Sequence, residues 1–208
     1  MSAAREYGLD EDFEWPRPPH GGWTADDLDR LPNLPPHTEL IDGSLVFVSP
    51  QTRFHLRTIR LLEYALLSQV PDAYDVDREF SVKLDRRNRP EPDLLVYRAD
   101  ADTGPGQTWH HSDSVILAVE VVSDDSEERD RDVKPRKYAA AGIPFFWRVE
   151  QNQGLPVVYT YELDPSTNTY SGTGIHHDRL KVSAPFPITI DLTAINRRPP
   201  VGPPPELP

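Results

Sequence analysis

The sequence predicts an α+β or α/β domain in which helices flank a mixed central β-sheet and a β-hairpin lies near the N-terminus. Three observations support this class. Residues 55–70 repeat apolar side chains at the spacing of one helical face. Several later runs are short, apolar and bounded by turn residues, as strands are. A second helical segment, residues 132–142, stands between two of these runs, and no internal repeat is visible.

The 208 residues are enough for one domain with extensions. We expect a flexible acidic extension over residues 1–21, the folded domain over 22–195 and a Pro-rich disordered tail over 196–208. The chain has no cysteine, which excludes disulfides, thiolate zinc sites and a cysteine nucleophile. The N-terminus lacks the pattern of a signal peptide and no run reaches membrane-span length, so a cytoplasmic location without membrane contact is expected.

The formal net charge of −12 argues against general affinity for nucleic acid, because Lys and Arg dominate phosphate binding. A local basic groove remains compatible with it. Carboxylates kept to hold a divalent cation would also make a chain acidic, although solubility is the commoner reason. Charge alone therefore decides little about function.

The N-terminal half offers three elements. Residues 23–33 are expected to form a short helix with Thr24 as N-cap and a stop at Pro32. Two β-prone runs meet at Asp42-Gly43, a strong hairpin signal. The longest helix is expected over residues 55–70, with one apolar face formed by Leu56, Ile59, Leu62, Leu66 and Val70.

The remaining elements are mostly strands. Apolar and polar residues alternate over 74–85, as in a half-exposed strand, and a polar loop over 98–113 separates two apolar strands. The expected strands cover 74–85, 92–97, 114–123, 145–150 and 156–163. Residues 180–192 close the domain. Between the third and fourth strands, a helix is expected with Asp132 as N-cap and Gly142 as its C-terminal stop.

Two carboxylates occupy unusual places in the strands. Asp93 follows Pro92 at the start of an apolar strand, and Glu120 lies between Val119 and Val121. A buried carboxylate is costly unless a partner stabilises its charge. For Glu120 the structural explanation is a salt bridge to a buried Arg or Lys, or a strand with one exposed face; for Asp93 it is a turn residue. Together, the two acids are also typical of a Mg²⁺ site completed by water and substrate phosphate.

Such a site would carry out metal-assisted phosphodiester hydrolysis. A cationic side chain is then needed to orient the water or to stabilise the developing charge. Lys134, in the first turn of the helix after Glu120, is a candidate for this group.

The ordered motifs "ELIDGSLVFVSP", "PEPDLLVY", "AVEVVSDDS" and "RDRDVKPRKYAAAGIPFFWRVE" resemble those of the Uma-two family of restriction endonucleases, within the PD-(D/E)XK nuclease superfamily. The resemblance covers roughly residues 22–192. It implies a restriction-endonuclease-like core and a metal-dependent nuclease that uses Mg²⁺ or Mn²⁺. It also implies that the motif aspartate and glutamate, the catalytic and metal-binding acids, are Asp93 and Glu120.

One position departs from the superfamily pattern. A lysine usually stands two residues after the glutamate, where this chain has Val122. The resemblance implies that a lysine of an aspartate-arginine-x-x-lysine pattern in the following helix replaces it, and Asp130, Arg131 and Lys134 supply that pattern.

Three accessory residues are candidates with simpler explanations beside them. Glu39 is either an additional ligand or water-holding group, or a hairpin residue that faces solvent. His55 either contacts phosphate or Asp93, or is a polar residue at a helix start. Tyr138, one turn after Lys134, either touches the site or packs against the sheet.

The histidine pairs at 110–111 and 176–177 do not predict zinc, because both fall in loop-like segments and no third ligand has the usual spacing. The acidic run 123–132 is read as a solvated loop.

The sequence thus predicts an endonuclease that cleaves DNA through Asp93, Glu120 and Lys134, with a homodimer as one expected assembly. The alternative is a catalytically silent protein that keeps the nuclease fold for binding or assembly. A weaker third interpretation is a hydrolase of small phosphate esters.

Overall fold

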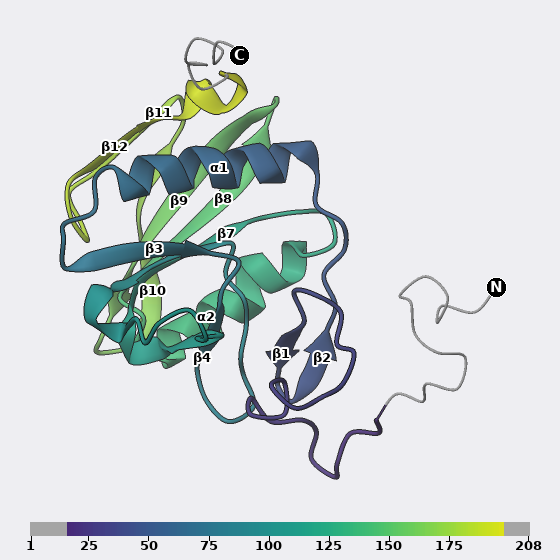
Figure 1. Ribbon diagram of the computed structural model, residues 1–208. Coiled ribbons are helices and arrows are strands. Elements are labelled where there is room, and N and C mark those ends of the chain that lie inside the picture. The colour runs from purple at the N-terminus through teal and green to yellow at the C-terminus, as the bar shows by residue number, and fades with distance from the viewer. Residues whose placement is uncertain (1–15, 198–208) are drawn as a thin grey trace, which may run out of the picture.

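A six-stranded mixed sheet forms the centre of the computed structural model, which describes residues 16–197 (Figure 1). The strand order is β10-β9-β8-β7-β5-β3. Only β7 and β8 pair in parallel; the other neighbours in this sheet are antiparallel. The strands are β3 (Tyr74–Arg78), β5 (Leu94–Arg98), β7 (Val115–Val121), β8 (Phe145–Asn152), β9 (Leu155–Asp164) and β10 (Thr169–His176). The predicted fold class is confirmed, whereas most of the expected N-terminal extension and C-terminal tail lies outside the described residues.

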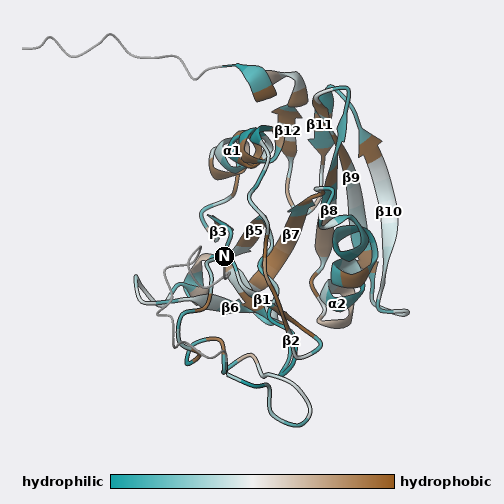
Figure 2. Cartoon of the chain, turned by 90° about the vertical axis from the view of Figure 1, so that its right-hand side faces the viewer, coloured by the Kyte–Doolittle hydropathy of each residue, from teal (hydrophilic) through white to brown (hydrophobic). Residues whose placement is uncertain are grey.

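Alternation along β7 divides the core into two layers. Leu117, Val119 and Val121 point to one face, where they pack with residues of helix α1 (Arg53–Leu67). Ala118 points to the opposite face, in a cluster with Tyr138 of helix α2 (Lys134–Ala140). The hydrophobic colour in Figure 2 is concentrated on the central strands β5, β7 and β8, between the two helices. Glu120 is therefore on the α2 face of a strand that is covered on both sides.

Helix α1 (Arg53–Leu67) crosses one face of the sheet, with Thr52 as its N-cap. Ile59, Leu62 and Leu66 are buried, as the periodicity predicted. Leu56 is not, since 55% of it is exposed, and His55 and Thr58 are buried instead. The expected apolar face was therefore wrong at Leu56. The helix begins two residues before the predicted start at residue 55 and ends before Val70. Val70 packs against the core from outside the helix.

The second helix crosses over between parallel strands β7 and β8. It begins with a π-helical segment, η4 (Arg129–Val133), and continues as α2 (Lys134–Ala140). Asp132 is therefore inside helical backbone, and the prediction that it caps the helix was wrong. Gly142 follows the helix end with φ of 81°, a conformation in which glycine has no steric cost, as the sequence predicted.

The N-terminal hairpin is present as β1 (Glu39–Ile41) and β2 (Ser44–Val46). Asp42 and Gly43 both have positive φ, 51° and 80°, which is the geometry of a tight hairpin turn. The hairpin lies at the α2 side of the sheet, where Lys137 Nζ is 2.6 Å from Asp42 Oδ1 (Figure 1).

Smaller elements complete the domain. Two additional two-stranded sheets consist of β4 (Ser81–Lys83) with β6 (Trp109–His111), and β11 (Arg179–Val182) with β12 (Ile188–Asp191). Three short 3₁₀ segments are η2 (Ala99–Ala101), η3 (Ser112–Ser114) and η5 (Leu192–Asn196). In the described part of the chain, no helix has the length and apolar character needed to cross a membrane.

Several local predictions were wrong. Residues 23–33 form successive turns instead of a helix, and the Thr24 backbone N–H and hydroxyl both donate to Asp27 Oδ2. The strand expected over 74–85 is interrupted at Glu79, whose φ is 49°, so β3 and β4 belong to different sheets. The polar loop 98–113 contains β6, and strand β10 was not expected at all.

Candidate active site

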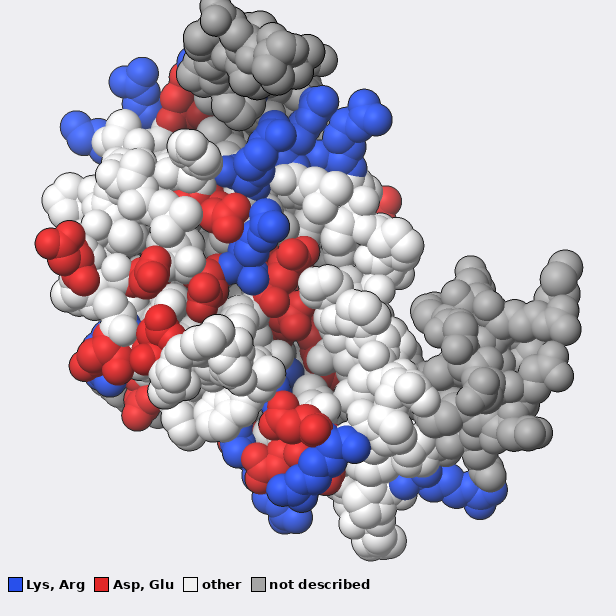
Figure 3. Space-filling model, viewed as in Figure 1, with Lys and Arg blue, Asp and Glu red and all other residues white. Residues whose placement is uncertain are grey.

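Five of the six predicted site residues line one cavity of about 610 Å³: Glu39, His55, Asp93, Glu120 and Lys134. Tyr138 is not among its lining residues. Its walls come from the β1 hairpin, the start of α1, the ends of β5 and β7, and the segment from Ser123 to Lys134. Its titratable lining residues are His37, Glu39, His55, Glu79, Glu91, Asp93, Glu120, Asp124, Asp125, Arg129, Asp130 and Lys134. Figure 3 shows acidic and basic side chains side by side around a hollow near the centre of the face seen in Figure 1.

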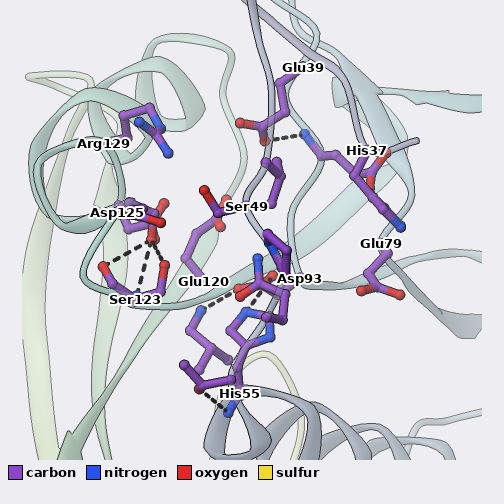
Figure 4. A pocket seen from close by; sticks show the side chains of 18 of the residues that line it. His37, Glu39, Ser49, His55, Glu79, Asp93, Glu120, Ser123, Asp125 and Arg129 are labelled. Carbon is purple, nitrogen blue, oxygen red and sulfur yellow. Dashed lines mark hydrogen bonds and ion pairs between the residues drawn. The ribbon is translucent and has the colours of Figure 1, made fainter. Parts of the chain in front are cut away.

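Asp93 stands immediately before β5 and faces β7. Strand register pairs Leu94 with Val119, so the next position along the two antiparallel strands sets Asp93 opposite Glu120. Asp93 Oδ2 accepts a 2.6 Å hydrogen bond from the backbone N–H of Val121. Its other oxygen, Oδ1, is 3.0 Å from His55 Nε2 (Figure 4). Asp93 is thus fixed by β7 and by α1, and it is more than a turn residue.

Glu120 is 1% exposed and is held by two side chains of α2. Its Oε2 accepts from Lys134 Nζ at 3.0 Å and its Oε1 accepts from the Tyr138 hydroxyl at 2.6 Å. Burial raises the pKa of Glu120 well above its usual value, although the Lys134 charge opposes the shift. The salt bridge to a buried lysine, one explanation for a carboxylate in this strand, is therefore present.

Lys134 lies among three carboxylates and is itself only 5% exposed. Besides Glu120, its Nζ is 2.8 Å from Glu39 Oε1 and 3.6 Å from Asp130 Oδ1. Burial by itself would lower the pKa of Lys134, but the charges of Glu120, Glu39 and Asp130 raise it well above the usual value. The ammonium therefore stays charged and is directed at Glu120 from the helix. Val122 occupies the position, two residues after Glu120, where the superfamily pattern has a lysine.

Glu39 and Tyr138 both reach the site. Glu39 is 2% exposed, and its Oε1 also accepts a 2.8 Å hydrogen bond from the backbone N–H of Glu91. The interpretation of Glu39 as a solvent-facing hairpin residue was therefore wrong. Tyr138 satisfies both of its interpretations, because its ring packs in the α2-side core while its hydroxyl binds Glu120. Burial raises the pKa of the Tyr138 hydroxyl, which keeps it a donor.

His55 is buried in the first turn of α1 and contacts Asp93, one of the roles considered for it. Its backbone N–H donates to Thr52 Oγ1, which fixes the start of the helix. The Nδ1 atom of the ring is buried and has no hydrogen-bond partner among the described residues. The ring thus contacts Asp93 through one nitrogen, Nε2.

Two features of the site were missed from the sequence, and a third residue, Asp130, was named only as part of the aspartate-arginine-x-x-lysine pattern and not as a site carboxylate. Asp130 is buried, accepts a short hydrogen bond from Ser126, and has no hydrogen-bond partner at Oδ1 within the described chain. Its spacing from Lys134, four residues, was the available signal. His37 and Glu91 form a pair with Nδ1 and Oε1 2.5 Å apart at the cavity rim. Arg129 also lines the cavity. Only the fold brings His37, Glu91 and Arg129 to this place.

The donor chemistry fits a hard divalent cation held by few protein ligands. Mg²⁺ prefers oxygen and is commonly held by one or two carboxylates with water and substrate phosphate. Asp93 and Glu120 supply such oxygens, and Asp130 Oδ1, which accepts no hydrogen bond within the described chain and lies 3.6 Å from Lys134 Nζ, is an additional acceptor in the same cavity. Across residues 16–197 no group of three or more acidic, His or Cys side chains is arranged to hold a metal by itself. A cation here would therefore rely on water and substrate for most of its ligands.

The histidine pairs are placed differently from the prediction. His110 and His111 belong to β6, so assigning them to a loop was wrong. His110 is buried against Phe80 and Tyr97, and its Nε2 is 2.9 Å from Asp77 Oδ2. The acidic run 123–132 is only partly a solvated loop, because it ends in the helix that carries Asp130.

Structural comparison agrees with this architecture. A protein of Anabaena variabilis ATCC 29413, described as a "putative nuclease belonging to DUF820", matches with a TM-score of 0.58 and 15% identity over 78% of this chain and 89% of that one. NucC of P. aeruginosa ATCC27853 in its cAAA-bound form gives a TM-score of 0.34 and 10% identity over 55% of this chain and 69% of that one. The first similarity shows a shared fold.

Comparison of the sequence with known proteins identifies the family. No curated protein matches this sequence. The family Uma2, described as "Putative restriction endonuclease", matches residues 25–194, which include the hairpin, both helices and all six strands of the central sheet. The motifs of the resemblance noted in the sequence all fall within this range. The chain therefore belongs to the Uma2 family.

Proposed function

We propose that this protein is a divalent-metal-dependent endonuclease that hydrolyses DNA phosphodiester bonds. One observation carries the proposal: Asp93 and Glu120 stand opposite each other at the ends of β5 and β7, with the Lys134 ammonium 3.0 Å from Glu120, inside one cavity. Membership of a restriction-endonuclease-like family supports the nucleic acid as the substrate. The acids, the lysine and the cavity are what metal-assisted hydrolysis requires.

In this proposal Asp93 and Glu120 hold Mg²⁺ or Mn²⁺. The bound ion would supply Lewis acidity toward the phosphate and lower the pKa of a water molecule. The Lys134 ammonium would orient an attacking water molecule or stabilise the charge that develops on the phosphate. His55 fixes the Asp93 carboxylate through the 3.0 Å contact between its Nε2 and Asp93 Oδ1. Tyr138 fixes the Glu120 carboxylate, because its hydroxyl donates to Glu120 Oε1. Glu39 holds Lys134 in place.

The proposed partners follow from this chemistry. DNA is the substrate, and a homodimer would give two sites for cleaving two strands. A cytoplasmic location would give access to DNA. Because the chain has a formal charge of −12, its affinity for a polyanion must come from the site and its metal instead of from general attraction.

The test combines metal titration with cleavage. Calorimetric titration with Mn²⁺ and a plasmid-nicking assay would be run on the wild type, Asp93→Asn and Glu120→Gln. Asp132→Asn is the matched control, since Asp132 is exposed on the same crossover and pairs with Arg136. We expect both site variants to lose metal binding and nicking, and the control to keep both. A wild type that shows no metal-dependent cleavage of any nucleic acid would overturn the proposal.

A second candidate is a catalytically silent nuclease-fold protein that acts in binding or assembly. The observation that favours it is that all four carboxylate oxygens of Asp93 and Glu120 already accept hydrogen bonds or ion pairs from the protein. Under this alternative, Glu120→Gln would leave metal titration and nucleic-acid binding unchanged. Release of phosphate from small esters without plasmid nicking would instead support a hydrolase of small substrates.

A further inference from the structure

The cavity contains four cationic or potentially cationic side chains, and three of them are already neutralised. Lys134 pairs with Glu39 and Glu120, His55 with Asp93, and His37 with Glu91. Arg129 is the fourth. Within residues 16–197 no carboxylate lies within ion-pair distance of Arg129, so its charge is available to a ligand.

Arg129 is half-buried, and one of its donors has no partner in the described chain. Its Nε is buried and has no acceptor among the described residues. A buried donor without a partner is destabilising, and a charged one is more so. Figure 4 shows Arg129 on the same side of the cavity as Asp125 and Ser123, across from the hairpin residues. An acceptor that enters the cavity would satisfy the guanidinium.

The charge balance of the cavity indicates what that acceptor is. Phosphate is anionic, and the lining is otherwise dominated by carboxylates that would repel it. A guanidinium presents donors in a planar fork that matches two phosphate oxygens, which a lysine cannot do. Lys134 is held by three carboxylates and is poorly suited to this task.

We propose that Arg129 binds a backbone phosphate of the nucleic-acid strand and so positions the strand over Asp93 and Glu120. This inference rests on the proposed function for the identity of the ligand. It assigns to Arg129 a role in substrate binding that is separate from the metal site and from Lys134. Arg129 is adjacent in sequence to Asp130, so the helical segment that supplies the guanidinium also supplies a carboxylate of the site.

The experiment measures binding separately from cleavage. Fluorescence anisotropy with labelled single-stranded and duplex DNA would be recorded over a salt series, with Ca²⁺ in place of Mg²⁺. The variants are Arg129→Ala and Arg129→Lys, and the matched control is Arg136→Ala, which removes an exposed arginine of the same helix. Steady-state cleavage with Mg²⁺ gives KM and kcat for the same proteins.

The expected result for Arg129→Ala is a loss of affinity of about tenfold with a rise in KM. The slope of log affinity against log salt should fall by about 0.9 for duplex or about 0.7 for single-stranded DNA, the value for one phosphate contact. Arg129→Lys should restore the slope but only part of the affinity, because it keeps the charge and loses the fork. Arg136→Ala should match the wild type.

The outcomes separate the two proposals. If the wild type binds DNA but does not cleave it, the proposed function fails while the Arg129 inference is still decided by binding. If the wild type cleaves and Arg129→Ala keeps wild-type affinity, salt slope and KM, the inference fails alone. If the wild type neither binds nor cleaves, both fail. Should Arg129→Ala not fold, as judged by circular dichroism, Arg129→Gln gives the same comparison.

Discussion

The ammonium of Lys134 lies 2.8 Å from Glu39 Oε1, in a site where both side chains are buried. This contact joins the N-terminal hairpin to the helix that follows β7. Because the same ammonium also binds Glu120, one charge compensates carboxylates from the hairpin and from the sheet. Lys134 therefore has a structural role in addition to the catalytic role proposed for it.

Replacing Lys134 by methionine should destabilise the fold by about 3–5 kcal/mol at neutral pH, because it leaves buried carboxylates uncompensated. The loss should shrink in acid. The pKa of Glu120 and that of Asp130 are raised by burial, so their uncharged forms suit the folded state, and the penalty returns as pH rises through those raised values. Urea unfolding at several pH values measures this.

The matched control for that variant is Lys137→Met. Lys137 pairs with Asp42, whose side chain is 70% exposed, so the change should be within about 1 kcal/mol. Equal destabilisation by the two variants would contradict the compensating role of Lys134.

Tyr138→Phe should weaken Mn²⁺ binding by about 10–100-fold while the protein stays folded, because the hydroxyl that orients Glu120 Oε1 is lost. Calorimetric titration measures the change. Tyr170→Phe is the control: its hydroxyl donates to the Ile143 carbonyl at 2.8 Å and takes no part in the cavity. If both variants bind Mn²⁺ like the wild type, Tyr138 does not support the metal site.

The pKa of His37 should lie above 6.5, because Glu91 accepts from its ring, with smaller contributions from Glu79 and Asp93. In Glu91→Gln we expect it to fall toward 6.5, as measured by NMR titration of the ring protons. The stabilisation from a raised histidine pKa is complete below about 6.5 and is lost as pH rises through the raised value. Glu162→Gln, on β9 and outside the cavity, should leave the titration unchanged.

The two leucines of α1 should respond differently to truncation. Leu62→Ala should cost about 2–5 kcal/mol, since Leu62 is fully buried in the core. Leu56→Ala should change stability by no more than about 0.5 kcal/mol, since Leu56 is largely exposed at the cavity wall. Thermal or urea unfolding compares them. A large loss from Leu56→Ala would mean that the apolar face predicted by periodicity is the buried one after all.

The sequence was informative where local pattern determines structure. Proline before Asp93, the alternation around Glu120 and the Asp42-Gly43 turn are short-range signals, and the hairpin register follows from that turn. The register that sets Asp93 opposite Glu120 is given by the pairing of β5 with β7 in the fold. Lys134 and Tyr138 lie one turn apart, so their common direction also follows from helical spacing. These residues could therefore be named as candidates before the fold was known.

Elsewhere the structure depends on contacts that no local pattern contains. Strand β10 is polar and glycine-containing because it is an edge strand with little burial. The start of the crossover helix was missed because its first turns are π-helical and acidic. Glu39 is buried against Lys134, which is far from it in sequence. Arg129 likewise lines the cavity only through the folding of distant segments around it.

The hairpin is attached to α2 by two lysines of different environment. The Lys137–Asp42 pair is accessible to mobile ions through Asp42, whose side chain is 70% exposed, and the screening length falls to about 3 Å at an ionic strength of 1 M. The Lys134–Glu39 pair is dry and is screened far less. We therefore expect concentrated salt to weaken the contact of the hairpin turn with the helix more than the contact of its first strand, so that the inner carboxylate of the cavity wall keeps its place.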